Sequence, residues 1–364
     1  MKHSFFITGY PGFLASSLIR QLVKDHGSTL EHTYLLVLPE QEAVATAELA
    51  YFIKQEKLNL DDFTIIPGDI TLPNFGMDEK FLSLLEETVT HVFHLAAIYD
   101  LAVPKDAAYN VNVHGTKTVN NWVQGLPQLK RYIYFSTAYV SGTREGHIYE
   151  KELRANQGFK NHYEETKYEA ELLVEAMKEY VPTTIIRPGI VKGNSKTGET
   201  IKFDGMYFML NLFDRLALSP ILPYLGDSKV EGNFVPSDYV LEATSYLAFA
   251  GVGAGKTYHL TDPHPYQMRD LYKMLAEAYL GKTPKGTIPL PIAGVPMQSK
   301  AIQKWLKVER ESLAYSTFNA SYDASQATLD LEGSGIKCPD MKDTIEPMIS
   351  FYRKYKDDQK KHIL

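Results

Sequence analysis

Two side chains that can share in a proton transfer lie four residues apart in the middle of the chain. Tyr163 and Lys167 belong to a segment with a helical pattern, so this spacing puts the phenol and the ammonium on one helix face. An unperturbed tyrosine titrates near pH ~10, and a nearby lysine charge lowers that pKa. The same ammonium can bond the ribose of a nicotinamide cofactor, which couples cofactor position to proton transfer. Because the spacing also arises by chance on exposed helices, its surroundings must decide.

The surroundings include the end of an expected strand at Arg131–Phe135, which Thr137 follows closely. A hydroxyl at such a strand end points into the crevice of the sheet, where Thr137 would hold a substrate carbonyl oxygen beside the Tyr163 phenol. Asn112, on the preceding helix, would orient Lys167 through a backbone or water-mediated link. Structural roles stay open for both residues, because a buried Thr often satisfies a backbone group and a helix Asn can serve packing alone.

A glycine pattern near the N-terminus predicts a dinucleotide-binding turn. Gly9 and Gly12 follow an apolar run and open a helical pattern, and Ala15 occupies the third small position. Gly9 would supply the tight turn, and Gly12 would let the backbone approach a pyrophosphate at the helix N-terminus. The placement between strand and helix makes the pattern informative, because such a loop alone is often only a turn.

Further positions along the same crevice are expected to contact the cofactor. Asp69 follows the third expected strand, where it would accept a hydrogen bond from the adenine amino group, although Pro-Gly-Asp is also good turn chemistry. The small residues after the fourth strand would let the cofactor lie against the backbone. The complete expected cofactor-binding set is Gly9, Tyr10, Gly12, Phe13, Leu14, Leu38, Asp69, Ile70, Leu95, Ala96, Ala97, Ser136, Tyr163, Lys167, Pro188, Gly189 and Val191. No metal site is expected.

The choice between dinucleotides depends on the end of the second strand. Leu38 stands where an arginine would accommodate the 2′-phosphate of NADPH, and no acid that would bind the ribose hydroxyls of NADH stands at the strand tip. Glu40 is slightly late for that role and equally suits the first turn of a helix. These residues leave NADP(H) and NAD(H) both open.

Short apolar runs alternate with helical patterns through the first half of the chain, which predicts an α/β fold with a Rossmann-type doubly wound parallel sheet. A later change to Gly, Pro and aromatic-rich segments predicts a smaller, mostly helical C-terminal substrate-binding cap. We expect residues 1–190 to form the NAD(P)-binding domain, with strands returning from about 231–262, and residues 191–230 and 263–364 to form the cap. The expected strands are Ser4–Thr8, Tyr34–Leu38, Phe63–Pro67, His91–Leu95, Arg131–Phe135, Thr183–Arg187, Gly232–Pro236 and Thr257–Thr261, and the expected helices are Phe13–Lys24, Gln41–Lys57, Glu79–Glu87, Ala107–Val123 and Tyr163–Tyr180.

Two later segments have patterns that invite a ligand. Segment 206–225 is unusually apolar, and core, pocket lining and lid stay open for it, although such a stripe is more often core. If it lines a pocket, its Met and aromatic side chains suit an apolar substrate. Gly251–Thr257 resembles the end of a phosphate-binding loop, but it precedes a strand instead of a helix, so we interpret it as a turn.

In their order along the chain, these motifs resemble those of the extended short-chain dehydrogenase/reductase family, from the N-terminus to about residue 262. The segments that look most like the fatty acyl-CoA reductase (male-sterility) and thioester reductase branch are Thr8–Leu14, Phe135–Val140, Arg187–Gly198 and Asn233–Val240. This branch implies hydride delivery from NADPH to the carbonyl carbon of an acyl thioester or aldehyde, with Tyr163 as proton donor and Thr137 polarising the oxygen. Leu38 and the lack of a strong basic cluster for a CoA or carrier phosphate depart from that pattern.

The composition excludes several classes of protein. The 364 residues carry a formal net charge of −6, which argues against nucleic acid as a partner because phosphate binding needs clustered Lys and Arg. No window reaches the roughly 18–20 continuous apolar residues of a membrane span, so no transmembrane segment is expected. The single cysteine, Cys338, fits a reducing compartment, most simply the cytoplasm.

The expected protein is therefore an NAD(P)-dependent oxidoreductase with a small, apolar substrate, and a homodimer is possible. One alternative is a dehydrogenase or epimerase of a sterol or nucleotide-sugar hydroxyl, which would use the same Tyr163 and Lys167. An alternative of another class is a dinucleotide-sensing protein without catalysis. The intact set of Thr137, Tyr163 and Lys167 argues against that last alternative.

Overall fold

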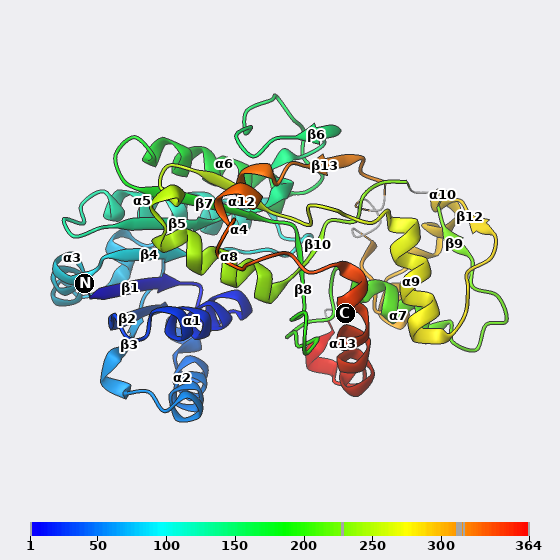
Figure 1. Ribbon diagram of the computed structural model, residues 1–364, viewed down its shortest axis with the longest axis horizontal. Coiled ribbons are helices and arrows are strands. Elements are labelled where there is room, and N and C mark those ends of the chain that lie inside the picture. The colour runs from blue at the N-terminus through cyan, green and yellow to red at the C-terminus, as the bar shows by residue number, and fades with distance from the viewer. Residues whose placement is uncertain (1, 227–228, 311–314, 316, 363–364) are drawn as a thin grey trace.

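A seven-stranded parallel sheet forms the larger lobe of the protein (Figure 1). The computed structural model describes residues 2–226, 229–310, 315 and 317–362. The strand order is β11-β7-β5-β4-β1-β2-β3, so the direction of winding reverses between β1 and β4. The strands are β1 (His3–Thr8), β2 (Leu30–Val37), β3 (Phe63–Pro67), β4 (His91–His94), β5 (Arg131–Phe135), β7 (Thr183–Pro188) and β11 (Thr257–Leu260). This topology confirms the expected Rossmann-type fold.

Helices cover both faces of this sheet, and each face has its own apolar core. Strand β1 shows the division, because Phe5 and Ile7 pack into one core and Phe6 into the other. The first core includes side chains of α1 (Phe13–His26), α2 (Glu42–Glu56) and α8 (Ser237–Phe249). The second includes side chains of α3 (Glu79–Thr88), α5 (Thr116–Val123) and α6 (His162–Met177).

Only one of the two later strands joins the main sheet. β11 pairs with β7, whereas β10 (Phe234–Pro236) pairs with β8 (Ile190–Lys192) in a separate two-stranded sheet. Gly189 lies between β7 and β8, and a Cβ atom there would be 2.7 Å from the carbonyl oxygen of Asn233. The chain therefore leaves the main sheet at a glycine that lets β8 and β10 approach each other.

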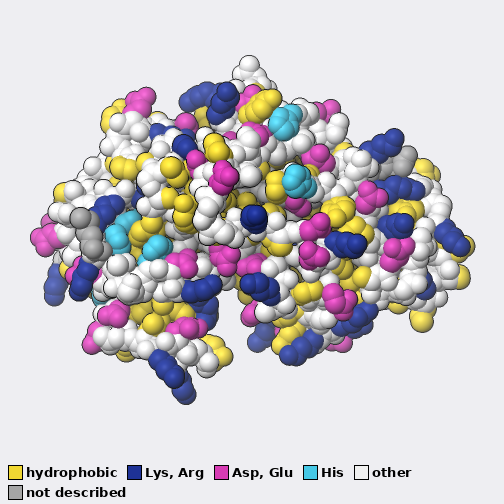
Figure 2. All heavy atoms as spheres, in the orientation of Figure 1, with side chains coloured by type: hydrophobic (Ala, Val, Ile, Leu, Met, Phe, Trp, Pro, Cys, Tyr) yellow, Lys and Arg dark blue, Asp and Glu magenta, His cyan; other side chains and the backbone are white. Residues whose placement is uncertain are grey.

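A second lobe, the cap, lies beyond the carboxyl ends of the strands (Figure 1). Its apolar core joins side chains of α7 (Tyr207–Arg215), α9 (Met268–Leu280) and α13 (Met341–Tyr355). Both ends of the apolar segment 206–225 belong to this core, because Met206, Phe213 and Leu222 are buried in it, whereas Leu218 between them is 99% exposed. In the space-filling view, a notch along the lower edge separates the two lobes (Figure 2).

Smaller elements join the two lobes and complete the cap. β13 (Ala320–Tyr322) pairs with β6 (Gly146–Ile148), and β12 (Thr287–Ile288) pairs with β9 (Tyr224–Leu225). The short helices are α4 (Lys105–Ala108), α10 (Leu290–Ala293), α11 (Lys300–Leu306) and α12 (Ser325–Asp330). Among the described residues, no helix is both long enough and apolar enough to cross a membrane.

Candidate active site

The structure places the Thr137 hydroxyl next to the Tyr163 phenol, close enough to shift the pKa of that phenol. Thr137 follows β5 and caps a single helical turn, accepting a bond of 3.3 Å from the backbone N–H of Tyr139. Tyr163 is in the first turn of α6, which Asn161 caps by accepting a bond of 2.9 Å from the N–H of Glu164. Burial raises the pKa of Tyr163 to about 12, and the Thr137 hydroxyl opposes part of that rise. The phenol is therefore protonated at neutral pH.

An open hollow of about 260 Å³ lies at the N-terminus of α6. It is lined by Phe159, Lys160, Asn161, His162 and Glu165. The Lys160 ammonium is held back from this space, because it donates to the Gly142 carbonyl at 2.7 Å and pairs with Glu164 at 3.1 Å. The hollow gives a molecule in solvent a route to the first turn of α6.

Lys167 lies one helical turn beyond Tyr163, and its side chain is buried. The ammonium donates to the Tyr134 hydroxyl at 2.8 Å and to the Phe135 carbonyl at 2.6 Å. Burial lowers the pKa of Lys167 to about 7, while the charge of Glu171 opposes that shift. Contrary to the expectation, Lys167 does not lower the pKa of Tyr163, because the amine is directed to β5 and loses much of its charge near neutral pH.

Asn112 supports this helix from the other side. The single helix expected over 107–123 is instead α4, a π-helical turn over Tyr109–Gly115, and α5. Asn112, in that π-helical turn, donates at 3.0 Å to both the Ile98 carbonyl and the Thr166 hydroxyl. Its direct contact is thus with the residue before Lys167, and π-helical turns often occur at functional sites.

The glycine turn fits a dinucleotide pyrophosphate. Gly9 has a φ of 90°, and a Cβ atom there would lie 2.8 Å from the backbone nitrogen of Ala96. Gly12 is exposed at the N-terminus of α1, and no side chain caps that helix end. Its N–H donates to the Gly9 carbonyl at 2.8 Å, which closes the turn. The N–H groups of the first turn of α1 are therefore available to an anion, as a pyrophosphate requires.

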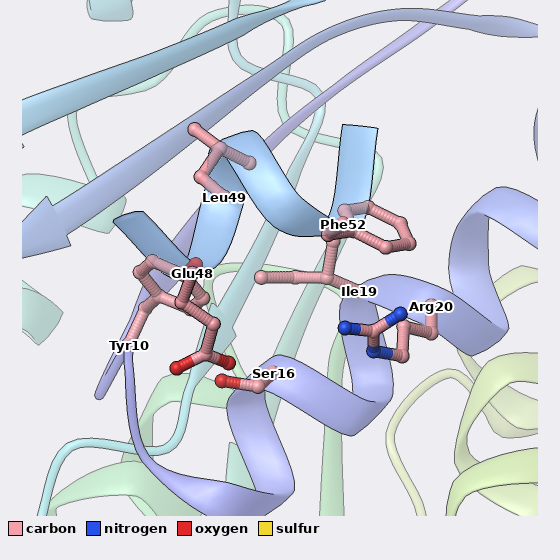
Figure 3. Close-up of a pocket in the computed structure, with 7 residues that line it drawn as sticks. All are labelled: Tyr10, Ser16, Ile19, Arg20, Glu48, Leu49 and Phe52. Carbon is pink, nitrogen blue, oxygen red and sulfur yellow. The ribbon is translucent and has the colours of Figure 1, made fainter. Parts of the chain in front are cut away.

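The side chain of Tyr10 holds this turn from behind instead of facing the crevice. Its hydroxyl donates to the Ala45 carbonyl of α2 at 3.2 Å. Around it, a shallow hollow with a volume of about 10 Å³ lies between α1 and α2 (Figure 3). Ser16 of α1 and Glu48 of α2 both point into this hollow. Of Tyr10, the backbone is therefore the part placed to contact a cofactor.

The side chains of two other predicted cofactor residues, Asp69 and Ser136, form hydrogen bonds within the protein. Asp69 accepts a bond of 2.8 Å from the N–H of Thr71, as in a plain turn. Ser136 is buried and donates to the Glu171 carboxylate. The remaining predicted positions lie at or after the carboxyl ends of strands, at the start of α1, or, for Val191, within β8. They are Phe13, Leu14, Leu38, Ile70, Leu95, Ala96, Ala97, Pro188, Gly189 and Val191. Their contact with a cofactor stays a prediction.

Sequence reasoning missed a buried ion pair under the site. Arg187 of β7 donates to the Glu171 carboxylate of α6 from Nε at 2.8 Å and from Nη2 at 2.5 Å. Both side chains are almost fully buried, with exposures of 2% and 0%. Glu171 lies four residues after Lys167 on the same helix face, but no spacing in the sequence links it to Arg187 on β7.

Replacing Gly9 with Ala is expected to weaken cofactor binding about tenfold or more, because the new Cβ strains a left-handed residue and meets the loop after β4. Fluorescence titration with NADPH measures the affinity. Gly333→Ala is the matched control, because Gly333 has a φ of 80° but open space around its Cβ position. Equal affinities of the two variants would show that the close approach at Gly9 is unimportant.

Comparison with known proteins identifies the family to which this chain is similar. Residues 7–244 match the model of the family described as male sterility protein. The fatty acyl-CoA reductase wat of Drosophila melanogaster is 27% identical over 272 residues, covering 65% of this chain and 52% of that protein. The non-canonical nonribosomal peptide synthetase cpsA of Aspergillus campestris is 26% identical over 326 residues, covering 83% of this chain and 29% of that protein. The chain thus spans about half or less of these relatives.

Solved structures agree in fold. The terminal R domain from the myxalamid PKS-NRPS biosynthetic pathway superposes with a TM-score of 0.79 at 22% identity, covering 97% of this chain and 91% of that one. The UDP-glucuronic acid 4-epimerase from Bacillus cereus in complex with NAD has a TM-score of 0.67 at 20% identity, covering 96% and 99%. Because the family match covers well over half of the chain, the protein belongs to the male sterility protein family, within the extended short-chain dehydrogenases/reductases.

Proposed function

We propose that this protein reduces the carbonyl group of a hydrophobic acyl thioester or aldehyde, with a reduced nicotinamide dinucleotide as the hydride source. The observation that carries the proposal is the placement of the Thr137 hydroxyl next to the Tyr163 phenol, which is protonated at neutral pH. A protonated phenol suits reduction, which needs an acid at the carbonyl oxygen, better than oxidation, which needs a base. The names of relatives, among them a fatty acyl-CoA reductase and an aldehyde reductase, support the same chemistry.

The cofactor would be held by the turn at Gly9 and Gly12, with its pyrophosphate at the N-terminus of α1. The bound cofactor would supply the hydride that adds to the carbonyl carbon. The Thr137 hydroxyl donates to the carbonyl oxygen and polarises it, and Tyr163 transfers its proton to that oxygen as negative charge develops. With a thioester, the C–S bond then breaks, and the departing thiolate takes up the proton from the oxygen, which leaves an aldehyde and a free thiol. The Lys167 ammonium, which donates to the Tyr134 hydroxyl and the Phe135 carbonyl, would have its third hydrogen left for the ribose of the cofactor.

A panel of substrates tests this proposal. Decanoyl-CoA and decanal are offered with NADPH or NADH, and cholesterol and UDP-glucose are offered with NADP⁺ or NAD⁺. We expect turnover of the two carbonyl compounds, measured by the change in nicotinamide absorbance. Turnover of the hydroxyl compounds alone would overturn the proposal and favour the alternative dehydrogenase or epimerase.

We further propose NADPH as the natural cofactor, on the strength of the family resemblance. Glu40, just after β2, is exposed and so is free to contact a ribose, which makes it the residue that would favour NADH. Fluorescence titration with both reduced cofactors measures the preference. Tighter binding of NADH that is lost in Glu40→Gln would contradict the NADPH assignment. The homodimer and the cytoplasmic location stay predictions from the sequence.

A further inference from the structure

We infer that a buried chain of hydrogen bonds through Tyr134, Thr116, His94 and Thr8 positions the Lys167 ammonium and ties it to the loop after β4. Tyr134 is the positioning residue that touches Lys167 itself. The inference deepens the proposed function and rests on it, because it concerns how the lysine of that site is held ready.

Tyr134 meets Lys167 in two ways. Its hydroxyl accepts from the ammonium at 2.8 Å, and its ring centroid lies 4.3 Å from Nζ. Tyr134 is 1% exposed, in the middle of the sheet on β5. The strand therefore offers the ammonium a phenol oxygen and an aromatic face in a place where water does not compete.

Beyond Tyr134, the chain of hydrogen bonds continues through side chains on α5, β4 and β1. The Thr116 hydroxyl on α5 lies next to the Tyr134 phenol and opposes part of the rise that burial causes in the pKa of that phenol. Thr116 is in turn 3.1 Å from Nε2 of His94 on β4, and Nδ1 of His94 is 2.8 Å from the Thr8 hydroxyl on β1. The Thr8 oxygen accepts from the backbone N–H of Ala96 at 3.1 Å. The chain thus ends on the loop that packs against Gly9 in the cofactor turn.

The protonation of His94 gives this chain a direction. Burial and the nearby Lys167 lower the pKa of His94 to about 3, so the ring is neutral and has one donor and one acceptor nitrogen. If each hydroxyl donates once, the bonds run from Tyr134 to Thr116, then to Nε2 of His94, and from Nδ1–H to Thr8. In that arrangement, each bond polarises the next, and the Tyr134 oxygen remains free to accept from Lys167.

A second buried tyrosine on the same strand, Tyr132, does not take part in this chain of hydrogen bonds. Tyr132 lies two residues before Tyr134, so both side chains point to the same face and both are buried. The Tyr132 hydroxyl donates to the Asn120 side chain of α5 at 2.8 Å. Tyr132 therefore resembles Tyr134 in burial and strand position but bonds α5 at a different point, which makes it the matched control.

The other titratable groups around Lys167 are Glu171, Tyr163 and His94, and none of them accepts a hydrogen bond directly from its ammonium. Glu171, on the same helix, favours the ammonium, but its carboxylate also binds Arg187 of β7. Tyr163, on α6, is a neutral phenol, and His94, on β4, is a neutral ring. Among the described residues, the atoms that accept directly from the Lys167 ammonium are the Tyr134 hydroxyl and a backbone carbonyl.

Tyr134→Phe tests the inference through the pH dependence of kcat/KM. Activity that needs the Lys167 ammonium is lost as the pH rises through the pKa of that residue, which burial lowers to about 7. Removal of the Tyr134 hydroxyl destabilises the ammonium and lowers its pKa. The basic limb of the pH profile, where kcat/KM falls with rising pH, is therefore expected to move to lower pH by about one unit. Tyr132→Phe is expected to leave that limb in place. A limb that stays in place in both variants would overturn the inference.

The middle of the chain is tested at His94. His94→Gln keeps a donor and an acceptor and is expected to retain the limb near its original position, whereas His94→Phe is expected to move it as Tyr134→Phe does. If His94→Phe fails to fold by far-UV circular dichroism, Thr116→Val breaks the adjacent link with a side chain of the same shape. The inference would be contradicted if kcat/KM fell at the same pH in His94→Gln and in the apolar variant, which is His94→Phe or, if that does not fold, Thr116→Val.

A second readout separates this inference from the proposed function. NADPH affinity is measured by fluorescence as a function of pH, without any substrate. We expect the affinity of Tyr134→Phe to decline at a pH about one unit lower than that of the unaltered protein and of Tyr132→Phe. An unaltered protein that binds NADPH but reduces no carbonyl compound would overturn the proposed function alone. Identical binding profiles of the three proteins would overturn the inference alone.

Discussion

Tyr163→Phe is expected to lower the turnover of an aldehyde by about 10²–10⁴-fold, because a general acid typically contributes that factor. The substitution removes one hydroxyl from the pair with Thr137 and keeps the ring in place. Affinity for NADPH is expected to change little, since the proposed pyrophosphate contacts are at Gly9 and Gly12 and do not involve the Tyr163 phenol. Steady-state kinetics and fluorescence titration on the same preparation measure the two effects.

The control for this variant is Tyr168→Phe on the same helix. Tyr168 packs its ring against Phe159, with 5.1 Å between the centroids, and a phenylalanine keeps that contact. Its turnover is expected to match that of the unaltered protein. If Tyr163→Phe retained full turnover, the phenol would have no part in the proton transfer.

Arg187→Met is expected to destabilise the protein by about 3–5 kcal/mol, because it leaves the Glu171 carboxylate buried without its partner. Arg187 also donates to the backbone carbonyls of Glu150 and Glu152, at 3.1 Å and 2.9 Å, and these lose a donor as well. Urea unfolding at neutral pH measures the free energy of unfolding. The double variant Arg187→Met, Glu171→Leu is expected to recover much of the loss, since it removes the unpaired charge.

Arg144→Met is the control for the effect of burial. Arg144 pairs with Glu152 at 2.7 Å, but the side chains are 19% and 37% exposed, so its loss is expected to cost less than about 1 kcal/mol. A similar loss of stability in Arg144→Met and Arg187→Met would contradict the account of the buried pair.

The parts of the site that depend on neighbours in sequence were predictable. Gly9 and Gly12 lie in one turn, and Tyr163 and Lys167 lie one helical turn apart, so their spacing alone fixes their relative positions. The sheet was predictable for a related reason, because each of its strands is a short apolar run between helical patterns. The separate pairing of β10 with β8 was not, because it depends on where the chain leaves the sheet, at Gly189.

The parts that depend on packing between distant segments could not be predicted. Lys167 was expected to act on Tyr163, but its amine binds Tyr134, which is 33 residues away and carries no motif. The same holds for Arg187 and Glu171, which are 16 residues apart and meet only when α6 packs on β7. The protonation of Lys167 follows from this burial, so its pKa near 7 was outside the reach of the spacing argument.

Transfer of deuterium tests the central claim most directly. NADPH that carries deuterium on the transferring face of the nicotinamide is incubated with the protein and decanal, and the alcohol is analysed by mass spectrometry. If the protein is a nicotinamide-dependent carbonyl reductase, decanol forms with deuterium on its former carbonyl carbon, and Tyr163→Phe forms far less of it. Decanol without deuterium, or no decanol from protein that binds NADPH, would contradict the claim.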